Sequence, residues 1–427
     1  MLEFRDEPYR WFPPKSDGVW SWLCARWILR HNRWVHLGRA QRIERVAVAH
    51  ADRVFRDREP GDRLLFLVNH PTHADAAVFL EAMRQLRVRV QMMAAYDVFL
   101  RSRVTRFVMQ RMGAFSVDRD GSDRRPVQQA MATLQRGRYP LVIFPEGNVY
   151  LTNDRVTPFQ DGAALIAVRA QEALTAEEGR DRGARVRVVP VAIRVTHATD
   201  ARAAVAERFA GVADALEIDA DLRADPLAAL RAAGGAAVAR NLKHRGLDAP
   251  PAAFGGDPPG VDGLAAAAAQ AAAGVLDRLE PKLGLTPKPD ATVTDRVRAA
   301  RRAVHAVRSD PARAADHAAA HTWADEALLA LRLDSYAVGY VHERPTLDRV
   351  AETVEKLEED VFNHMPEPVA PRHATVSFGT PLDVRERLVA GRKRQVMADL
   401  TADAQAAVQA LVDEANATNE HPGAEPF

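Results

Sequence analysis

The feature that most constrains the fold is an apolar run at residues 64–68, which ends directly in Asn69, His70 and Pro71. Five consecutive large apolar side chains are typical of a strand buried on both faces, as in a parallel sheet covered by helices. Pro71 disfavours a helical conformation for His70, but it suits the first position of a helix. We therefore expect His70 at the end of the strand and Asp75 about one turn into the helix that follows.

This placement allows the His70 ring to meet the Asp75 carboxylate. On one regular helix, residues five apart point roughly 140° away from each other. With His70 outside the helix, Asp75 can bind one imidazole nitrogen and leave the other free. An imidazole that is oriented by a carboxylate can take a proton from a hydroxyl group.

The alternation of strand and helix continues along the chain. Apolar runs predict further strands at 88–93, 114–117, 141–144 and 187–195, with helices at 76–86, 99–112, 125–136 and 162–174. This order predicts an α/β fold with a mostly parallel sheet covered by helices. Ligands bind at the carboxyl ends of the strands in such sheets. His70, Arg119 and Glu146 each follow a predicted strand, so we expect them at one site.

The sequence changes character after residue 196, where Ala, Asp and Arg dominate. A high Ala content favours helix, and Thr294 and Thr346 are candidate N-caps. The expected helices lie at about 200–233, 263–280, 294–308, 311–333 and 346–363.

We therefore expect a large α-helical insertion at residues 197–369. A strand pattern returns at 374–378 and is followed by a helix at about 395–415. The α/β domain would then consist of residues 60–196 and 370–415, with a disordered tail at 416–427.

Composition narrows the class of protein. A formal net charge of +1 argues against a general nucleic-acid binder. The single cysteine, Cys24, excludes an intramolecular disulfide and fits a reducing compartment. No stretch approaches the ~20 uninterrupted apolar residues of a membrane-spanning helix. Residues 1–10 lack the basic start and apolar run of a cleavable signal.

Tryptophan and arginine gather near the N-terminus. Five of the six Trp lie in the first 34 residues, and residues 19–42 contain five Arg and no Asp or Glu. Trp20, Trp27 and Trp34 recur near helical spacing, with arginines between them. An amphipathic helix of this kind suits the headgroup region of an anionic bilayer. We expect membrane-interface helices within residues 1–59; the alternative is a helix that packs its Trp side chains into the protein's own core.

Four motifs occur in an order that resembles one enzyme family. They are NH-x4-D at 69–75, G-x3-V-x-R at 113–119, FPEG at 144–147 and V-P-V at 189–191. A Phe-x-x-Gly feature at 159–162 and a Gly-x-Pro at 379–381 agree with them. Together they resemble the glycerolipid acyltransferase family, typified by 1-acyl-glycerol-3-phosphate acyltransferase. The two strongest motifs lie about 75 residues apart, each directly after an apolar strand.

The resemblance implies transfer of a fatty acyl group from acyl-CoA or acyl-carrier protein to a hydroxyl of a lysophospholipid, with lysophosphatidic acid as the first candidate. His70 would be the general base and Asp75 would orient it, with no metal and no cofactor beyond the acyl donor. Such an enzyme of phospholipid biosynthesis would work at the cytoplasmic face of a membrane as a peripheral protein. The residues implied in substrate binding are Asn69, Thr72, Gly113, Arg119, Glu146, Gly147 and Asn148.

The sequence departs from the family pattern at two places. Asn148 and Val149 follow FPEG where the family has Thr or Ser and then Arg, so that Arg124, Arg125 or Arg155 would have to replace one cation. Ala95 and Tyr96 stand where a lysine is common. These departures motivate an alternative, a non-catalytic lipid-binding protein on a degenerate acyltransferase fold. A hydrolase is less consistent because the sequence has no G-x-S-x-G turn.

One further pattern concerns metals. His317 and His321 lie four apart on an expected helix, with Asp325 one turn further on. This spacing is compatible with a metal site, but a solvated helix face is the more common meaning of such a pattern.

Overall fold

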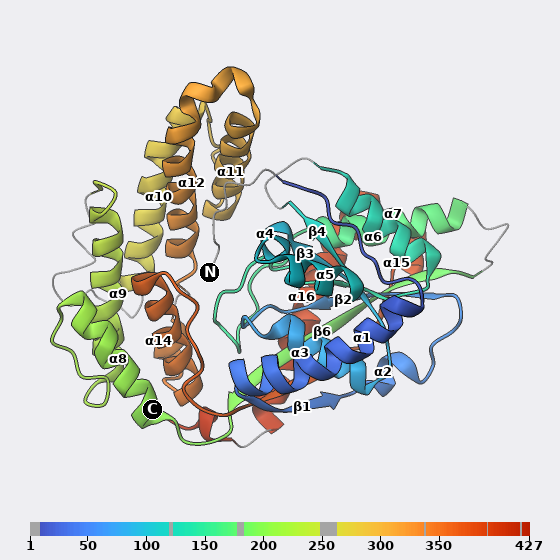
Figure 1. The fold of residues 1–427 in the computed structure, drawn as a ribbon, viewed down its shortest axis with the longest axis horizontal. Coiled ribbons are helices and arrows are strands. Elements are labelled where there is room, and N and C mark those ends of the chain that lie inside the picture. Colours follow the sequence, from blue (N-terminus) through green and yellow to red (C-terminus); the bar gives the residue numbers. More distant parts are fainter. Residues whose placement is uncertain are drawn as a thin grey trace.

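The computed structural model describes residues 9–118, 123–176, 183–247, 263–336, 339–390, 392–418 and 421–427. The described chain has two parts that lie side by side (Figure 1). One is a sheet covered by helices. The other, called the helical module, is a group of helices inserted in the sequence between two strands that are neighbours in that sheet.

The described residues form a sheet of eight strands, and most of its pairs are parallel. The strand order is β1-β7-β6-β2-β5-β3-β4, and β8 pairs with β6 off this path. Among these described strands, only the pairs that β6 makes with β7 and β8 are antiparallel. The mostly parallel α/β fold is therefore confirmed. The strands are β1 (Ile43–Ala49), β2 (Asp62–Val68), β3 (Gln91–Ala95), β4 (Ala114–Val117), β5 (Leu141–Ile143), β6 (Arg185–His197), β7 (Arg372–Phe378) and β8 (Leu382–Asp383).

Helices cover both faces of the sheet, as the apolar run of β2 predicted. Leu64 and Phe66 belong to one apolar cluster, while Leu65 and Leu67 belong to the other, because successive side chains of a strand point to opposite faces. The first cluster includes α2 (Asp52–Phe55) and α3 (Asp75–Gln85). The second includes α6 (Arg125–Arg136), α7 (Gly162–Ala176), α15 (Val384–Ala390) and α16 (Lys393–Thr418).

The helical module connects β6 to β7 and has apolar clusters of its own. One cluster joins α8, α9 and α14, a second joins α9, α10, α11 and α12, and a third joins α11 and α12. Thr346 caps α14 as predicted, whereas α11 is capped by Thr292 rather than Thr294. The module consists of α8 (Arg202–Leu216), α9 (Pro226–Lys243), α10 (Gly263–Leu283), α11 (Val293–Ser309), η3 (Pro311–Asp316), α12 (His317–Asp334), α13 (Tyr340–Glu343) and α14 (Leu347–Phe362).

The N-terminal segment contains a strand that the sequence did not predict. Helix α1 (Val19–His31) continues into the π-helix η1 (Asn32–Ala40), and then β1 joins the edge of the sheet. In β1, Ile43 and Val46 are buried while the two charged residues between them are exposed. The only apolar run of this edge strand is a short one of Val and Ala at 46–49. Because β1 pairs with β7 in the sheet, the boundary predicted at residue 60 is wrong.

The C-terminal tail is also ordered where the structure describes it. Helix α16 extends to Thr418, beyond its predicted end at 415. The short helix η4 (Pro422–Ala424) follows, and the backbone N–H of Phe427 donates to the carbonyl of Pro345. For the described residues 416–418 and 421–427, the expected disorder is wrong, because η4 and Phe427 pack against the start of α14.

Candidate active site

The predicted contact between His70 and Asp75 is present at the carboxyl end of β2. The chain leaves β2 at Val68, turns without regular structure, and enters α3 at Asp75, so Asp75 is the first residue of the helix rather than one turn into it. His70 Nδ1 lies 2.9 Å from Asp75 Oδ2. Thr72 adds a backbone N–H bond to Oδ2 at 2.9 Å and a hydroxyl bond to Oδ1 at 2.7 Å.

These contacts set the roles of the two imidazole nitrogens. Asp75 is fully buried and accepts from three donors, so its carboxylate makes Nδ1 of His70 the protonated nitrogen. The His70 side chain is 24% exposed. Its Nε2 has no hydrogen-bond partner among the described residues and is left to accept a proton. The site therefore holds a base that is aimed by a buried carboxylate.

Glu146 ties the loop after β5 to the turn that carries His70. Its Oε1 accepts the backbone N–H of His70 at 2.7 Å, and its Oε2 accepts the backbone N–H of Thr157 at 3.1 Å and the Thr157 hydroxyl. Burial raises the pKa of the Glu146 carboxyl, and the hydrogen bond from Thr157 opposes that rise. The Phe144 ring lies 4.6 Å from the His70 ring. We predicted a substrate contact for Glu146, but the structure occupies both of its oxygens within the fold.

The two glycines predicted at the site have backbone reasons to be there. Gly147 has φ +78°, and a Cβ at this position would lie 2.1 Å from Nε2 of Gln160. The Gln160 amide donates to the carbonyl of Glu146 at 3.1 Å. Gly113 has φ +93°, and its Cβ would lie 2.4 Å from the carbonyl oxygen of Val90. Gly147 thus permits a close approach of the chain beside the site. Gly113 precedes β4, which runs parallel to β3, so it lies at the amino ends of the parallel strands and not at the edge that holds His70.

The remaining predicted binding residues have different surroundings. Both polar atoms of the Asn69 amide bond to the backbone of Ile193 in β6, at 3.0 and 2.6 Å, which occupies them within the fold. Asn148 hydrogen-bonds Tyr150, whose pKa burial raises. Arg119 lies outside the described residues.

The cations considered as replacements are partly engaged. Arg155 pairs with Glu343 at 2.7 Å, and Arg125 pairs with Asp123 at 3.0 Å, whereas Arg124 is exposed. In the histidine pattern on α12, Asp325 pairs with Arg245 at 2.7 Å. Within the ranges given above, no three His, Cys, Asp or Glu side chains come together in a way that could hold a metal ion.

The comparison with protein families agrees with this site. Residues 45–194, from β1 to β6, match the family model described as Acyltransferase. This segment contains His70, Asp75 and Glu146, and it belongs to the glycerolipid acyltransferase family. It supports an acyltransferase activity. No curated protein and no solved structure matches the chain.

Several residues around the site were not expected from the sequence. Thr157 and Phe144 contact Glu146 and His70, and His73 pairs with Glu359 of α14 at 3.1 Å. Thr157 follows Glu146 by 11 residues, whereas Glu359 lies 286 residues from His73. The apolar strand before Phe144 carried a local signal, but nothing in the sequence pairs His73 with a helix so distant.

Proposed function

We propose that this protein transfers a fatty acyl group from acyl-CoA or acyl-carrier protein to a hydroxyl of a lysophospholipid-type acceptor, with lysophosphatidic acid as the first candidate. Such a transfer belongs to phospholipid biosynthesis. The observation that carries the proposal is the 2.9 Å contact between His70 Nδ1 and Asp75 Oδ2, within a segment of the acyltransferase family.

The proposed reaction is a single displacement without a covalent enzyme intermediate. Nε2 of His70 takes the proton of the acceptor hydroxyl while the hydroxyl oxygen attacks the thioester carbonyl. The tetrahedral intermediate then breaks its carbon–sulfur bond, and the departing thiolate receives the proton back from the imidazolium. Asp75 stabilises that imidazolium. A positioned base of this kind typically contributes about 10²–10⁴-fold.

We also propose that the protein binds a membrane surface from the cytoplasmic side. The side chains of Trp22, Trp27 and Trp34 are 48%, 69% and 69% exposed, so these three do not pack into a core. Helix α5 (Arg103–Arg111) packs against α1 and adds exposed Val104 and Phe107. Exposed tryptophans among arginines suit an anionic lipid interface. None of the helices in the described ranges is long and apolar enough to cross a membrane.

An acceptor screen tests the proposed reaction. Purified protein receives acyl-CoA or acyl-carrier protein together with a panel of lysophospholipids, and lipid mass spectrometry detects the products. A diacyl product from lysophosphatidic acid that disappears in His70→Ala supports the proposal. A wild-type protein that is silent with every acceptor, or a His70→Ala variant as active as wild type, contradicts it.

The same screen separates the non-catalytic alternative. A lipid-binding protein without activity would bind vesicles equally well as wild type and as His70→Ala, with no turnover in either. The ordered His70–Asp75 contact favours the enzyme, because lipid binding alone has no need of an oriented base.

A further inference from the structure

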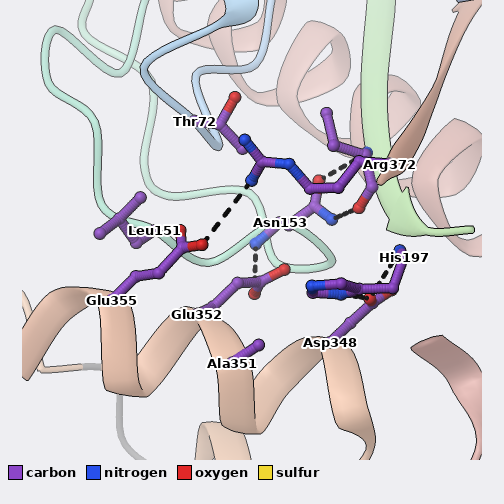
Figure 2. Close-up of a pocket in the computed structure, with 10 residues that line it drawn as sticks. Thr72, Leu151, Asn153, His197, Asp348, Ala351, Glu352, Glu355 and Arg372 are labelled. Carbon is purple, nitrogen blue, oxygen red and sulfur yellow. Dashed lines mark hydrogen bonds and ion pairs between the residues drawn. The ribbon is translucent and has the colours of Figure 1, made fainter. Parts of the chain in front are cut away.

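One face of α14 carries a buried row of carboxylates that faces the sheet and its loops, and Glu352 in this row also accepts from the Tyr340 hydroxyl of α13. Asp348, Glu352, Glu355 and Glu359 are each at most 9% exposed. Their spacing of four, three and four residues places them on one side of a helix. Figure 2 shows the first three pointing from the helix toward the loops and strands of the α/β part.

Two of these carboxylates, Asp348 and Glu355, contact residues of strands β6 and β7. Asp348 accepts from Nδ1 of His197 at 2.7 Å and pairs with Arg194 at 3.1 Å, both residues of β6. Glu355 lies 3.9 Å from the guanidinium of Arg372, the first residue of β7. These contacts join α14 to β6 and β7, the two strands between which the helical module is inserted in the sequence.

The other two carboxylates reach the loops that form the candidate site. Glu359 Oε2 lies 3.1 Å from Nε2 of His73, inside the turn between His70 and Asp75. Burial opposes ionisation of Glu359, but the hydrogen bond from His73 and the nearby positive charge together outweigh it and lower the pKa of Glu359 to about 2. Glu352 accepts the backbone N–H of Asn153 at 3.1 Å, in the loop that connects Glu146 to Thr157.

The turn and the helix also face each other directly. Thr72 lines one side of a small cavity, and Ala351, Glu352 and Glu355 line the opposite side (Figure 2). The cavity measures about 10 Å³, which is close to the space that one water molecule needs. Because Thr72 holds both oxygens of Asp75, α14 borders the hydrogen bonds that orient the catalytic carboxylate.

Stability alone is a poor reason for such a row. Buried charges lose their hydration, and apolar residues of similar volume often stabilise a fold as well or better. A row of paired carboxylates instead fixes the groups it contacts in defined positions.

We propose that α14 holds the turn of residues 69–75 in position for the reaction through its contact with this turn. Glu359 and His73 are the positioning residues. The inference rests on the proposed role of His70 as the base. Under it, catalysis depends on a helix that lies outside the segment matched by the acyltransferase family. Removal of the Glu359–His73 contact takes away the hydrogen bond between α14 and the turn, and a small displacement of the base lowers kcat.

The test compares two neighbouring carboxylates of the same helix. Glu359→Ala removes the contact with the turn, whereas Glu358→Ala removes a carboxylate that pairs with Arg208 and His364, away from the site. We expect Glu359→Ala to lower kcat about 10-fold with little change in KM. Glu358→Ala leaves kcat within about twofold. Glu359→Gln recovers most of the loss, since its amide oxygen still accepts from His73.

A double-mutant cycle and a measurement without turnover complete the test. His73→Ala lowers kcat like Glu359→Ala, and the double variant loses no more than either, because both remove one interaction. Hydrogen exchange of peptides that span residues 69–79 is faster in Glu359→Ala than in wild type and unchanged in Glu358→Ala. Equal kcat and equal exchange in the two alanine variants, or additive losses in the cycle, overturn the inference.

Different results would contradict the proposed function and the proposed role of α14. If His70→Ala keeps full activity, or wild type shows no turnover, the general-base mechanism is wrong, and the exchange comparison alone decides whether α14 holds the turn. If His70→Ala is inactive while Glu359→Ala matches Glu358→Ala in both measurements, the mechanism stands and the positioning role is wrong.

Discussion

The α/β part and the helical module use buried polar groups differently. In the α/β part, the interior of β2 is apolar, and the reactive groups His70 and Asp75 stand where the strand ends. In the module, the apolar clusters are internal, and the acidic face of α14 is turned toward the other part. Under the proposed function, the first arrangement provides chemistry at an edge of the sheet. Under the proposed role of α14, the second holds the loops at that edge in place, so that the site would be built from both parts.

The largest effect is expected at the carboxylate that aims the base. Asp75→Asn replaces an acceptor of three hydrogen bonds by an amide with one acceptor oxygen, so Nδ1 of His70 loses its fixed proton. We expect kcat to fall by about 10²–10⁴-fold. Steady-state kinetics with the acceptor found in the screen measures this. A loss smaller than that of Glu359→Ala would reverse the proposed division between chemistry and positioning.

A second prediction concerns the backbone of the α/β part. Gly147→Ala places a Cβ at φ +78° and 2.1 Å from Gln160, which displaces the amide that holds the Glu146 carbonyl. We expect a loss of about 1–3 kcal/mol in the free energy of unfolding. Gly162→Ala is the matched control, since its Cβ meets nothing within 4 Å and α7 begins there. Urea unfolding of both variants is the measurement; equal stabilities would contradict the strained turn.

A third prediction addresses the contact between the two parts. Burial opposes ionisation of Asp348, but the hydrogen bond from His197 and the charge of Arg194 outweigh it and lower its pKa to about 2. A lowered pKa contributes stability above the ordinary value of 3.8, and this contribution is lost as the pH falls from about 4 to about 2. The expected contribution is roughly 2 kcal/mol.

Unfolding of Asp348→Asn at several pH values checks this sign. The difference in stability from wild type should be largest near pH 6 and shrink toward pH 2. Asp399→Asn, at an exposed position of α16, serves as the control and should show no such trend. A difference that grows as the pH falls would show that the contact does not favour the ionised carboxylate.

The smallest effect is expected at the exposed surface of the N-terminal helices. Trp27→Ser together with Trp34→Ser removes two side chains that contribute little to any core, so thermal stability should change by less than about 1 kcal/mol. Point substitutions are preferable to a deletion because Phe12 and Leu37 are buried. Sedimentation with anionic vesicles should show several-fold weaker binding. Unchanged binding would overturn the proposed membrane surface.

The sequence predicted those features whose causes are local. Strand β4 at 114–117 and helix α6 at 125–136 match their predicted bounds, because a buried run and an amphipathic period mark them. The His70–Asp75 contact spans five residues, and Pro71 between them decides the geometry. Strand β1 was missed because it is an edge strand with charged residues inside it.

The features that the sequence did not predict depend on contacts between residues far apart in the chain. Glu146 was predicted as a substrate residue from its motif, yet its partners are the backbone of His70 and Thr157. The pairing of His73 with Glu359 crosses 286 residues, and no local pattern connects the two segments. Only the folded chain brings such groups together.

The most direct test of the account is the rate of acyl transfer in His70→Ala compared with wild type. Single-turnover kinetics with acyl-CoA and lysophosphatidic acid, at equal folded protein as judged by thermal unfolding, isolates the chemical step. We predict a loss of about 10²–10⁴-fold in that step, without an acyl adduct on either protein by intact mass. A His70→Ala variant that transfers the acyl group within a few-fold of the wild-type rate would contradict it.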